Sequence, residues 1–103
     1  MKTGFPVVAA DPGVTRQVLS HGPELMVVAF RFETGAAGKR HRHPHVQSTY
    51  VESGQFEFTI EDVVHQLGPG DSIIIPSNAW HGCVCNAKGV LIDNFTPRRE
   101  DFL

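Results

Sequence analysis

The chain has 103 residues, a formal net charge of −2 and a pI near 6.3. This length predicts one domain, spanning residues 1–103, and the small net charge gives no electrostatic reason to expect nucleic acid or an anionic membrane as a partner. An apolar fraction of 41% with 19% charged residues is typical of a globular protein and excludes a disordered or fibrous one.

The N-terminal stretch Met1–Asp11 carries one basic residue and a very short apolar patch that Pro6 interrupts. It predicts neither a signal peptide nor a membrane span, so we expect a cytoplasmic protein. Cys83 and Cys85 are the only two cysteines, and a spacing of i and i+2 on a strand is poorly suited to an unstrained bridge. A disulfide framework is therefore excluded.

Short β-type runs separated by glycine and proline fill the rest of the chain, and no window shows a helical period. The clearest alternation places Phe56, Phe58 and Ile60 in one buried row. Eight such runs predict an all-β sandwich or closed barrel. The expected strands are Val14–Leu19, Leu25–Glu33, Val46–Glu52, Gln55–Ile60, Val63–Leu67, Ser72–Ile75, Gly82–Cys85 and Val90–Phe95.

Residues 41–47, with the sequence HRHPHVQ, bring three histidines and a glutamine together. Neutral imidazole is the commonest side-chain metal ligand. If this segment enters a strand, its odd-numbered residues from His41 to Gln47 fall on one face, because side chains alternate with a period of two. One strand face is then able to hold a metal.

The spacing around this segment matches a known pattern. Gly54 follows Gln47 after six residues, and Gly70 is followed after five residues by Pro76 and then by a lone His81. These segments resemble the two signature motifs of the cupin superfamily, G-x5-H-x-H-x(3,4)-E-x6-G and G-x5-P-x-G-x2-H-x3-N. The departures are Gln47 in place of glutamate, Asn78 in place of glycine, Asn86 one residue late, and a displaced first glycine at Gly38 or Gly35.

The resemblance implies a single-domain cupin, which is a small double-sheet β-barrel, or jelly roll, that holds one divalent metal inside. The ligands implied by the motif positions are His41, His43, Gln47 and His81. His45 competes with them because it lies on the same odd-numbered face. The family spacing selects His41 and His43 instead, so we expect His45 beside the ligands or at the rim of the pocket.

Other candidate ligands have plainer interpretations. Single histidines such as His21 and His65 are far more often solvated than bound to a metal. Cys83 and Cys85 share the parity of His81, so a thiolate ligand is conceivable, but free cysteines usually fill a strand face as small apolar residues.

Gln47 affects the net charge of the expected metal site. Three neutral imidazoles and an amide leave the full charge of a dication in place, whereas a glutamate would cancel half of it. Such a cation favours an anionic ligand and acts as a Lewis acid, which predicts a small acid as substrate. The donor set excludes a dedicated calcium or magnesium site, and the affinity order favours nickel, copper or zinc over manganese and iron, although availability in the cell can override that order, so the identity of the metal stays open.

The C-terminal segment Val90–Leu103 places a carboxylate, an aromatic ring and a guanidinium at Asp93, Phe95 and Arg99. Asp93 and Phe95 share a strand face. On composition alone, a charged terminal run such as Arg98–Asp101 is a solvated end. The segment nevertheless strongly resembles the D-x-F-(S/T)-P-x-R-E-D-F-L ending of the KdgF-type pectin-degradation cupins, and this resemblance runs over most of residues 38–103.

This second resemblance implies an enzyme of pectin and alginate degradation. It would convert 4,5-unsaturated monouronates into the linear 5-keto-4-deoxyuronate by ring opening and tautomerisation. Asp93 would exchange protons, Arg99 would bind the carboxylate and Phe95 would pack against the sugar. These roles are physically suitable, since a carboxylate near a dication serves as acid or base and the arginine fork matches a carboxylate.

Two other classes stay open. One is an iron-dependent cupin dioxygenase, and the other is a non-catalytic cupin that binds a sugar acid, because one fold hosts many chemistries. We also expect a homodimer that covers edge strands, with residues 5–8 as an added strand or contact. Trp80 and Phe102 are candidates for wall or dimer contacts as much as for substrate platforms.

Overall fold

The computed structural model describes residues 4–103. These residues form eight β-strands and one short 3-10 helix, with no α-helix, which confirms the all-β prediction. No helix among them is long and apolar enough to span a membrane. The elements in chain order are β1 (Val7–Ala9), β2 (Val14–Gly22), β3 (Leu25–Phe32), β4 (Ala37–His41), β5 (Val46–Ile60), β6 (Val63–Leu67), β7 (Ser72–Ile75), β8 (His81–Thr96) and η1 (Glu100–Phe102).

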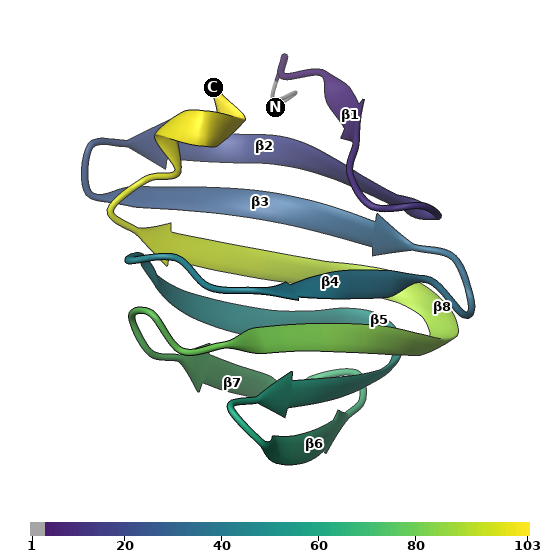
Figure 1. Cartoon of the computed structure of the whole chain (residues 1–103). Coiled ribbons are helices and arrows are strands. Elements are labelled where there is room, and N and C mark those ends of the chain that lie inside the picture. The colour runs from purple at the N-terminus through teal and green to yellow at the C-terminus, as the bar shows by residue number, and fades with distance from the viewer. Residues whose placement is uncertain (1–3) are drawn as a thin grey trace.

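Two long strands, β5 and β8, connect the two layers of the fold. The C-terminal half of β8 pairs with β3 and with the N-terminal half of β5, whereas its N-terminal half pairs with β4 and with the C-terminal half of β5. The first layer is extended by β2 and β1 on one side and by β7 on the other, and β6 extends the second layer. Figure 1 shows β8 bending at the right from its green half in front to its yellow-green half behind.

Glycines allow these bends. Gly54 has a φ of +85°, and the pairing of β5 with β8 shifts register three times between Val51 and Phe56. A Cβ atom on Gly89 would lie 2.0 Å from the carbonyl oxygen of Ser53, so no other residue fits there without moving the backbone. The two strands therefore cross closely at paired bulges and continue into the other layer instead of ending.

The predicted strand limits are wrong at these glycines, because each pair of short strands is one continuous strand. The histidine segment also differs from its prediction. His41 ends a strand, β4, that was not predicted, and residues 42–45 form a loop before β5 begins. The histidines and the glutamine therefore do not share one strand face. The added strand expected near residues 5–8 exists as β1, and it pairs with β2 of the same chain.

The core lies between the two layers. Phe56 and Phe58 are 1% and 3% exposed, as their alternation predicted, and Ile60 packs against the same cluster. Both cysteines are free and buried, as expected, and burial raises the pKa of the Cys83 thiol to about 12. A thiol with so high a pKa stays protonated and serves as a packing group.

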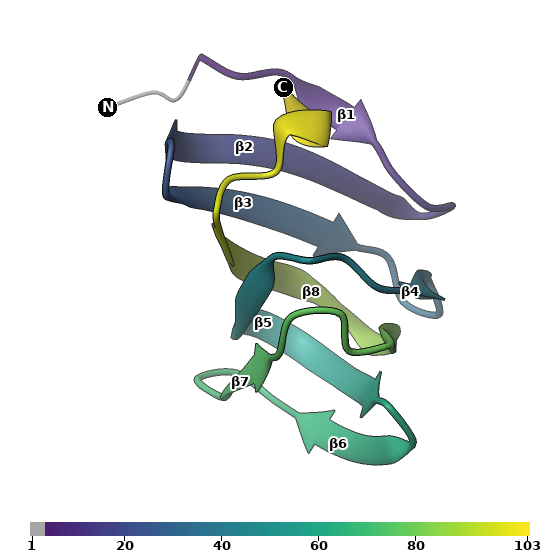
Figure 2. The same ribbon diagram turned by 60° about the vertical axis from the view of Figure 1, so that its left-hand side comes forward.

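A second core cluster occupies the end of the first layer nearest the C-terminal tail. It consists of Val18, Met26, Val28 and Phe95, with Phe5, Phe30 and Phe102 packed against it. In the two views of the fold, η1 lies over the β2 side of this layer (Figures 1 and 2). The tail is therefore part of the folded body and brings Phe102 against the core.

Candidate metal centre

A cavity of about 430 Å³ opens between the two layers. Its walls combine apolar side chains with charged and metal-ligating groups from strands far apart in the sequence. They include Arg16, Phe30, Phe32, Lys39, His41, Gln47, Phe58, His81, Leu91, Asp93, Phe95, Arg99 and Phe102. This mixture of an apolar lining with a few convergent polar groups is typical of a small-molecule site.

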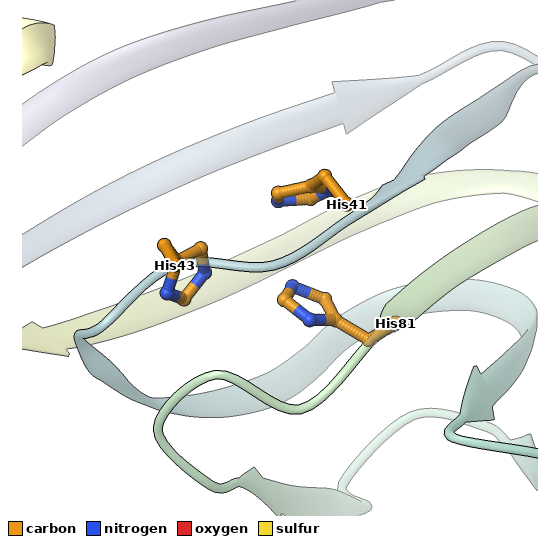
Figure 3. Close-up of side chains that lie close together, drawn as sticks. All are labelled: His41, His43 and His81. Carbon is orange, nitrogen blue, oxygen red and sulfur yellow. The ribbon is translucent and has the colours of Figure 1, made fainter.

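Three histidines meet at one end of this cavity. His41 and His81 are cross-strand partners in the β4–β8 pair, and His43 follows in the loop after β4. One ring nitrogen from each of the three lies within 4.8 Å of those of the others, and the ring centroids of His41 and His81 are 4.4 Å apart. Figure 3 shows the three rings gathered between β4 and the start of β8.

Main-chain carbonyls orient all three rings. Each Nδ1 atom lies 2.7–3.0 Å from the carbonyl oxygen of a residue two positions away in the chain, which is Lys39 for His41, His45 for His43 and Ala79 for His81. A carbonyl oxygen only accepts hydrogen bonds, so Nδ1 carries the proton and Nε2 presents a lone pair. Metal-ligating histidines are usually oriented in this way.

The donor set fits a bound cation. The Nε2 atom of His81 is buried without a hydrogen-bond partner, and burial lowers the pKa of His81 to about 4. Burial, assisted by the positive charge of Arg99, also lowers the pKa of His43. The Nε2 atom of His43 faces Oε1 of Gln47 at 3.0 Å, so two lone pairs meet where a cation would satisfy both. The nitrogen-rich set suits a divalent transition metal.

A buried hydrogen-bond chain connects this cluster with Asp93. The Gln47 Nε2 donates to the Thr49 hydroxyl at 2.9 Å, and that hydroxyl donates to Oδ1 of Asp93 at 2.6 Å. Thr49 and Asp93 are cross-strand partners in the β5–β8 pair, and Gln47 is two residues before Thr49, so all three share the inner face. These hydrogen bonds therefore turn the amide oxygen of Gln47 towards His43.

Thr49 is not among the predicted site residues. Its signal was present, because Thr49 is a polar residue with the same parity as Gln47 in a strand whose inner face is otherwise apolar. Its importance became visible only with the register that pairs it with Asp93. Thr49 is fully buried, so its hydroxyl needs both partners that it has.

Asp93 has the properties of an acid–base group. Burial raises the pKa of Asp93 to about 7, against the hydrogen bonds from Thr49 and Gln47 and the positive charge of Arg99, which lower it. A carboxyl group that titrates near neutral pH is able both to release and to accept a proton there. Asp93 also lines the cavity, so a bound molecule can reach it.

Arg99 and Phe95 lie together beside this carboxyl. The Arg99 Cζ is 5.1 Å from the centre of the Phe95 ring and 4.3 Å from that of Phe102. Its Nε and Nη2 atoms donate to the two carboxylate oxygens of Asp101, at 3.0 and 2.8 Å, and this bond lowers the pKa of Asp101. With its side chain only 12% exposed, Arg99 belongs to the cavity and not to a solvated end.

The remaining predicted residues take different places. Phe95 is 2% exposed and packs edge-on against His43 at 5.6 Å, so it is a wall shared by the cavity and the core. His45 is outside the three-histidine cluster, but its carbonyl orients His43. Trp80 is not part of the cavity lining, and the guanidinium groups of Arg40 and Arg42 lie over its ring.

The fold and the three-histidine cluster define a class of protein. Residues 28–92 match the family model of the cupin domain, and the chain belongs to this family. The cupin resemblance of the two sequence motifs is thereby confirmed.

Three similar proteins show where the chain belongs within the cupin family. The pectin degradation protein KdgF of Dickeya dadantii (strain 3937) is 41% identical over 93 residues, which cover 88% of this chain and 84% of the relative. KdgF from Halomonas sp. has a solved structure that is 36% identical, with a TM-score of 0.93 and coverage of 100% of this chain and 96% of that one. An RmlC-like cupin from Shewanella frigidimarina NCIMB 400 is 40% identical, with a TM-score of 0.92 and coverage of 97% and 90%. Within the cupin family, the chain is therefore of the KdgF type.

Proposed function

We propose that this protein converts 4,5-unsaturated monouronates, of the kind that lyases release from pectin or alginate, into linear 5-keto-4-deoxyuronate. One observation carries the proposal: Asp93, a carboxyl group that titrates near neutral pH, shares a cavity with a three-histidine cluster and is connected to it through Thr49 and Gln47. The likeness to a protein named for pectin degradation supports the class of substrate.

The reaction opens a sugar ring and moves protons, but it transfers no electrons to an acceptor. His41, His43 and His81, with the oxygen of Gln47 alongside, would hold one divalent transition metal. When bound, such an ion supplies Lewis acidity to a hydroxyl or carbonyl oxygen. Because its ligands are neutral, the site retains a positive charge and favours an anionic substrate.

Asp93 would exchange protons with the hydroxyl group of the opening ring and with the enol carbon. Its position is fixed by the Thr49 hydroxyl, which is held in turn by Gln47, so the carboxyl does not depend on solvent for its orientation. A positioned acid–base group contributes about 100-fold to 10,000-fold to a rate. Asp93 is the group for which we expect the largest loss of turnover at unchanged metal content.

Arg99 would hold the substrate carboxylate near Asp93. Asp101 occupies its Nε and Nη2 atoms, so the Nη1 group would be the donor to a ligand. Phe95 would form an apolar wall against which the ring of the sugar packs. The cavity of about 430 Å³ suits one sugar ring and not a polysaccharide chain.

The test follows the absorbance of the unsaturated bond. Purified protein is incubated with the unsaturated monouronate in the absence of oxygen, and the product is identified by NMR. We expect the enol-ether absorbance to disappear and a linear ketone to form. A dioxygenase would need oxygen, and a binding protein would leave the spectrum unchanged, so either of these results contradicts the proposal.

A further inference from the structure

Arg16 points into the molecule from a strand face that is otherwise apolar. Val14 and Val18, which flank it on the inner face of β2, are 4% and 6% exposed, and Arg16 itself is partly buried. A guanidinium in such a row is informative, because withdrawing a charge from water costs free energy unless a partner replaces the water. The side chain of Arg16 lines the same cavity as His41, His81 and Asp93.

Arg16 has no ion-pair partner within residues 4–103. The ion pairs found there are Lys88–Glu33, Arg98–Glu100 and Arg99–Asp101. Asp11 also lines the cavity, but its carboxylate accepts a hydrogen bond from the main-chain N–H of Lys39 at 2.9 Å. Arg16 is therefore a cation in a partly closed cavity with its donor groups available.

The aromatic ring of Phe102 holds Arg16 in place. The Arg16 Cζ lies 4.4 Å from the centre of this ring, and the Cζ of Arg99 lies 4.3 Å from the same centre. The two guanidinium groups thus share one ring through cation–π contacts. They differ in one respect, because Arg99 forms an ion pair with Asp101 whereas no carboxylate among residues 4–103 forms one with Arg16.

We propose that Arg16 is a carboxylate-binding residue of this cavity and that it selects acids over neutral sugars; this rests on the proposed function. Its planar fork matches a carboxylate with two parallel hydrogen bonds. In the register, Arg16 pairs with Phe30 and Phe30 with Leu91, two residues from Asp93. Two strand spacings, about 10 Å in total, therefore separate the β2 and β8 backbones, which is a span that one sugar acid fills.

Arg16 and Arg99 then divide the task of binding the anion. Arg99, with one free Nη1 group, supplies positive charge close to Asp93, and Arg16 supplies the complete fork. The carboxylate of the substrate would bind at the arginine end of the cavity, and its ring oxygens would face the histidine cluster. Recognition would fail for an ester or amide of the same sugar, which has no negative charge.

The test measures binding without turnover. The full-length protein, with its metal retained, is titrated by calorimetry with galacturonate and with galacturonate methyl ester in a buffer free of other carboxylates and phosphate. We expect wild type to bind the acid at least about tenfold more tightly than the ester, and Arg16→Gln to lose most of that preference, with Arg99 and the metal accounting for what remains. Arg16→Lys, which keeps the charge but not the fork, should be intermediate. Arg31→Gln, an exposed arginine on the neighbouring strand β3, is the matched control and should resemble wild type.

The outcomes separate the inference from the proposed function. If Arg16→Gln keeps the preference for the acid, or if wild type shows none, Arg16 does not bind the carboxylate. If Arg16→Gln does not fold, as shown by its melting curve, Arg16→Met keeps the apolar stem over Phe102 and is measured in its place. If the variants lose the preference but wild type leaves the unsaturated monouronate unchanged, the inference about Arg16 stands and the enzymatic proposal is refuted.

Discussion

The two ends of the cavity are built in opposite ways. At the histidine end, neutral rings from β4, the following loop and β8 direct lone pairs at a common point, which suits a cation. At the arginine end, the guanidinium groups of Arg16 and Arg99 lie over Phe102, which suits an anion. Asp93 lies between these ends, so a molecule with a carboxylate on one side and ring oxygens on the other matches both.

Removal of a histidine should have the largest effect, because it takes away one of three nitrogen donors. We expect His81→Ala to lower metal affinity by more than about 100-fold and to abolish turnover, with both measured after metal titration. His65→Ala, on β6 and outside the cluster, is the matched control and should keep both. A variant without His81 that still binds one metal per chain with wild-type affinity would show that the metal lies elsewhere.

Asp93→Asn should remove the acid–base group between the two ends of the cavity without emptying the histidine end. The amide keeps the shape of the side chain but neither gives nor takes a proton, so we expect turnover to fall by about 100-fold or more while the metal content is unchanged. Asp62→Asn, in an exposed turn, serves as the control. If Asp93→Asn turns over the unsaturated uronate at the wild-type rate, Asp93 has no part in the chemistry.

Thr49→Val should produce a smaller effect of the same kind. It removes the hydroxyl between Gln47 and Asp93 with little change in shape, so we expect metal affinity and kcat each to fall by about tenfold and Thr49→Ser to restore them. Thr59→Val, on the opposite face of the same strand, is the control. Equal loss in the valine and serine variants would indicate a packing effect, because serine retains the hydroxyl.

The pH dependence of stability, and not of turnover, tests the raised pKa of Asp93, and it should be measured on chelator-treated protein, since a bound dication changes the local charges. The pKa of Asp93 is raised from 3.8 to about 7 by burial, so the folded state holds more protons than the unfolded state between these pH values. The contribution of the protonated Asp93 carboxyl group to stability is therefore present at low pH and is lost as the pH rises from about 4 to about 7.

His81 acts in the opposite direction. Burial lowers its pKa from 6.5 to about 4, so its neutral form adds stability as the pH rises through that range. The Asp93→Asn substitution removes the contribution of Asp93 and keeps that of His81. We expect the melting temperature of Asp93→Asn minus that of wild type to increase between about pH 4 and pH 8, by the equivalent of a few kcal/mol. A difference that is constant with pH would contradict the raised pKa.

The histidine end could be predicted from sequence because its members lie close together or follow a fixed motif spacing. His41 and His43 are neighbours in the chain, and the Gly70–Pro76–His81 spacing is that of a strand, a turn and the start of the next strand. The motif spacing was enough to name these residues, but strand alternation placed them wrongly, because residues 42–45 form a loop and not part of a strand.

At the arginine end and the centre, Asp93, Phe95 and Arg99 were predicted from the resemblance of the C-terminal segment, but their neighbours were not. Arg16, Thr49 and Phe102 gain their roles from register and from the tail folding against β2, which are long-range properties. The strand limits predicted at Gly54 and Gly89 were wrong for a related reason. A glycine in a strand pattern marks either a turn or a bulge, and only the crossing of β5 with β8 distinguishes the two.

The most direct measurement is a metal titration of chelator-treated protein in the presence of the unsaturated monouronate, with its enol-ether absorbance as the readout. We expect no turnover without metal, a rate that rises in proportion to the added ion, and a plateau at about one equivalent per chain. Full activity in the chelator-treated protein, or a rate that does not depend on the added ion, would contradict a metal held by His41, His43 and His81.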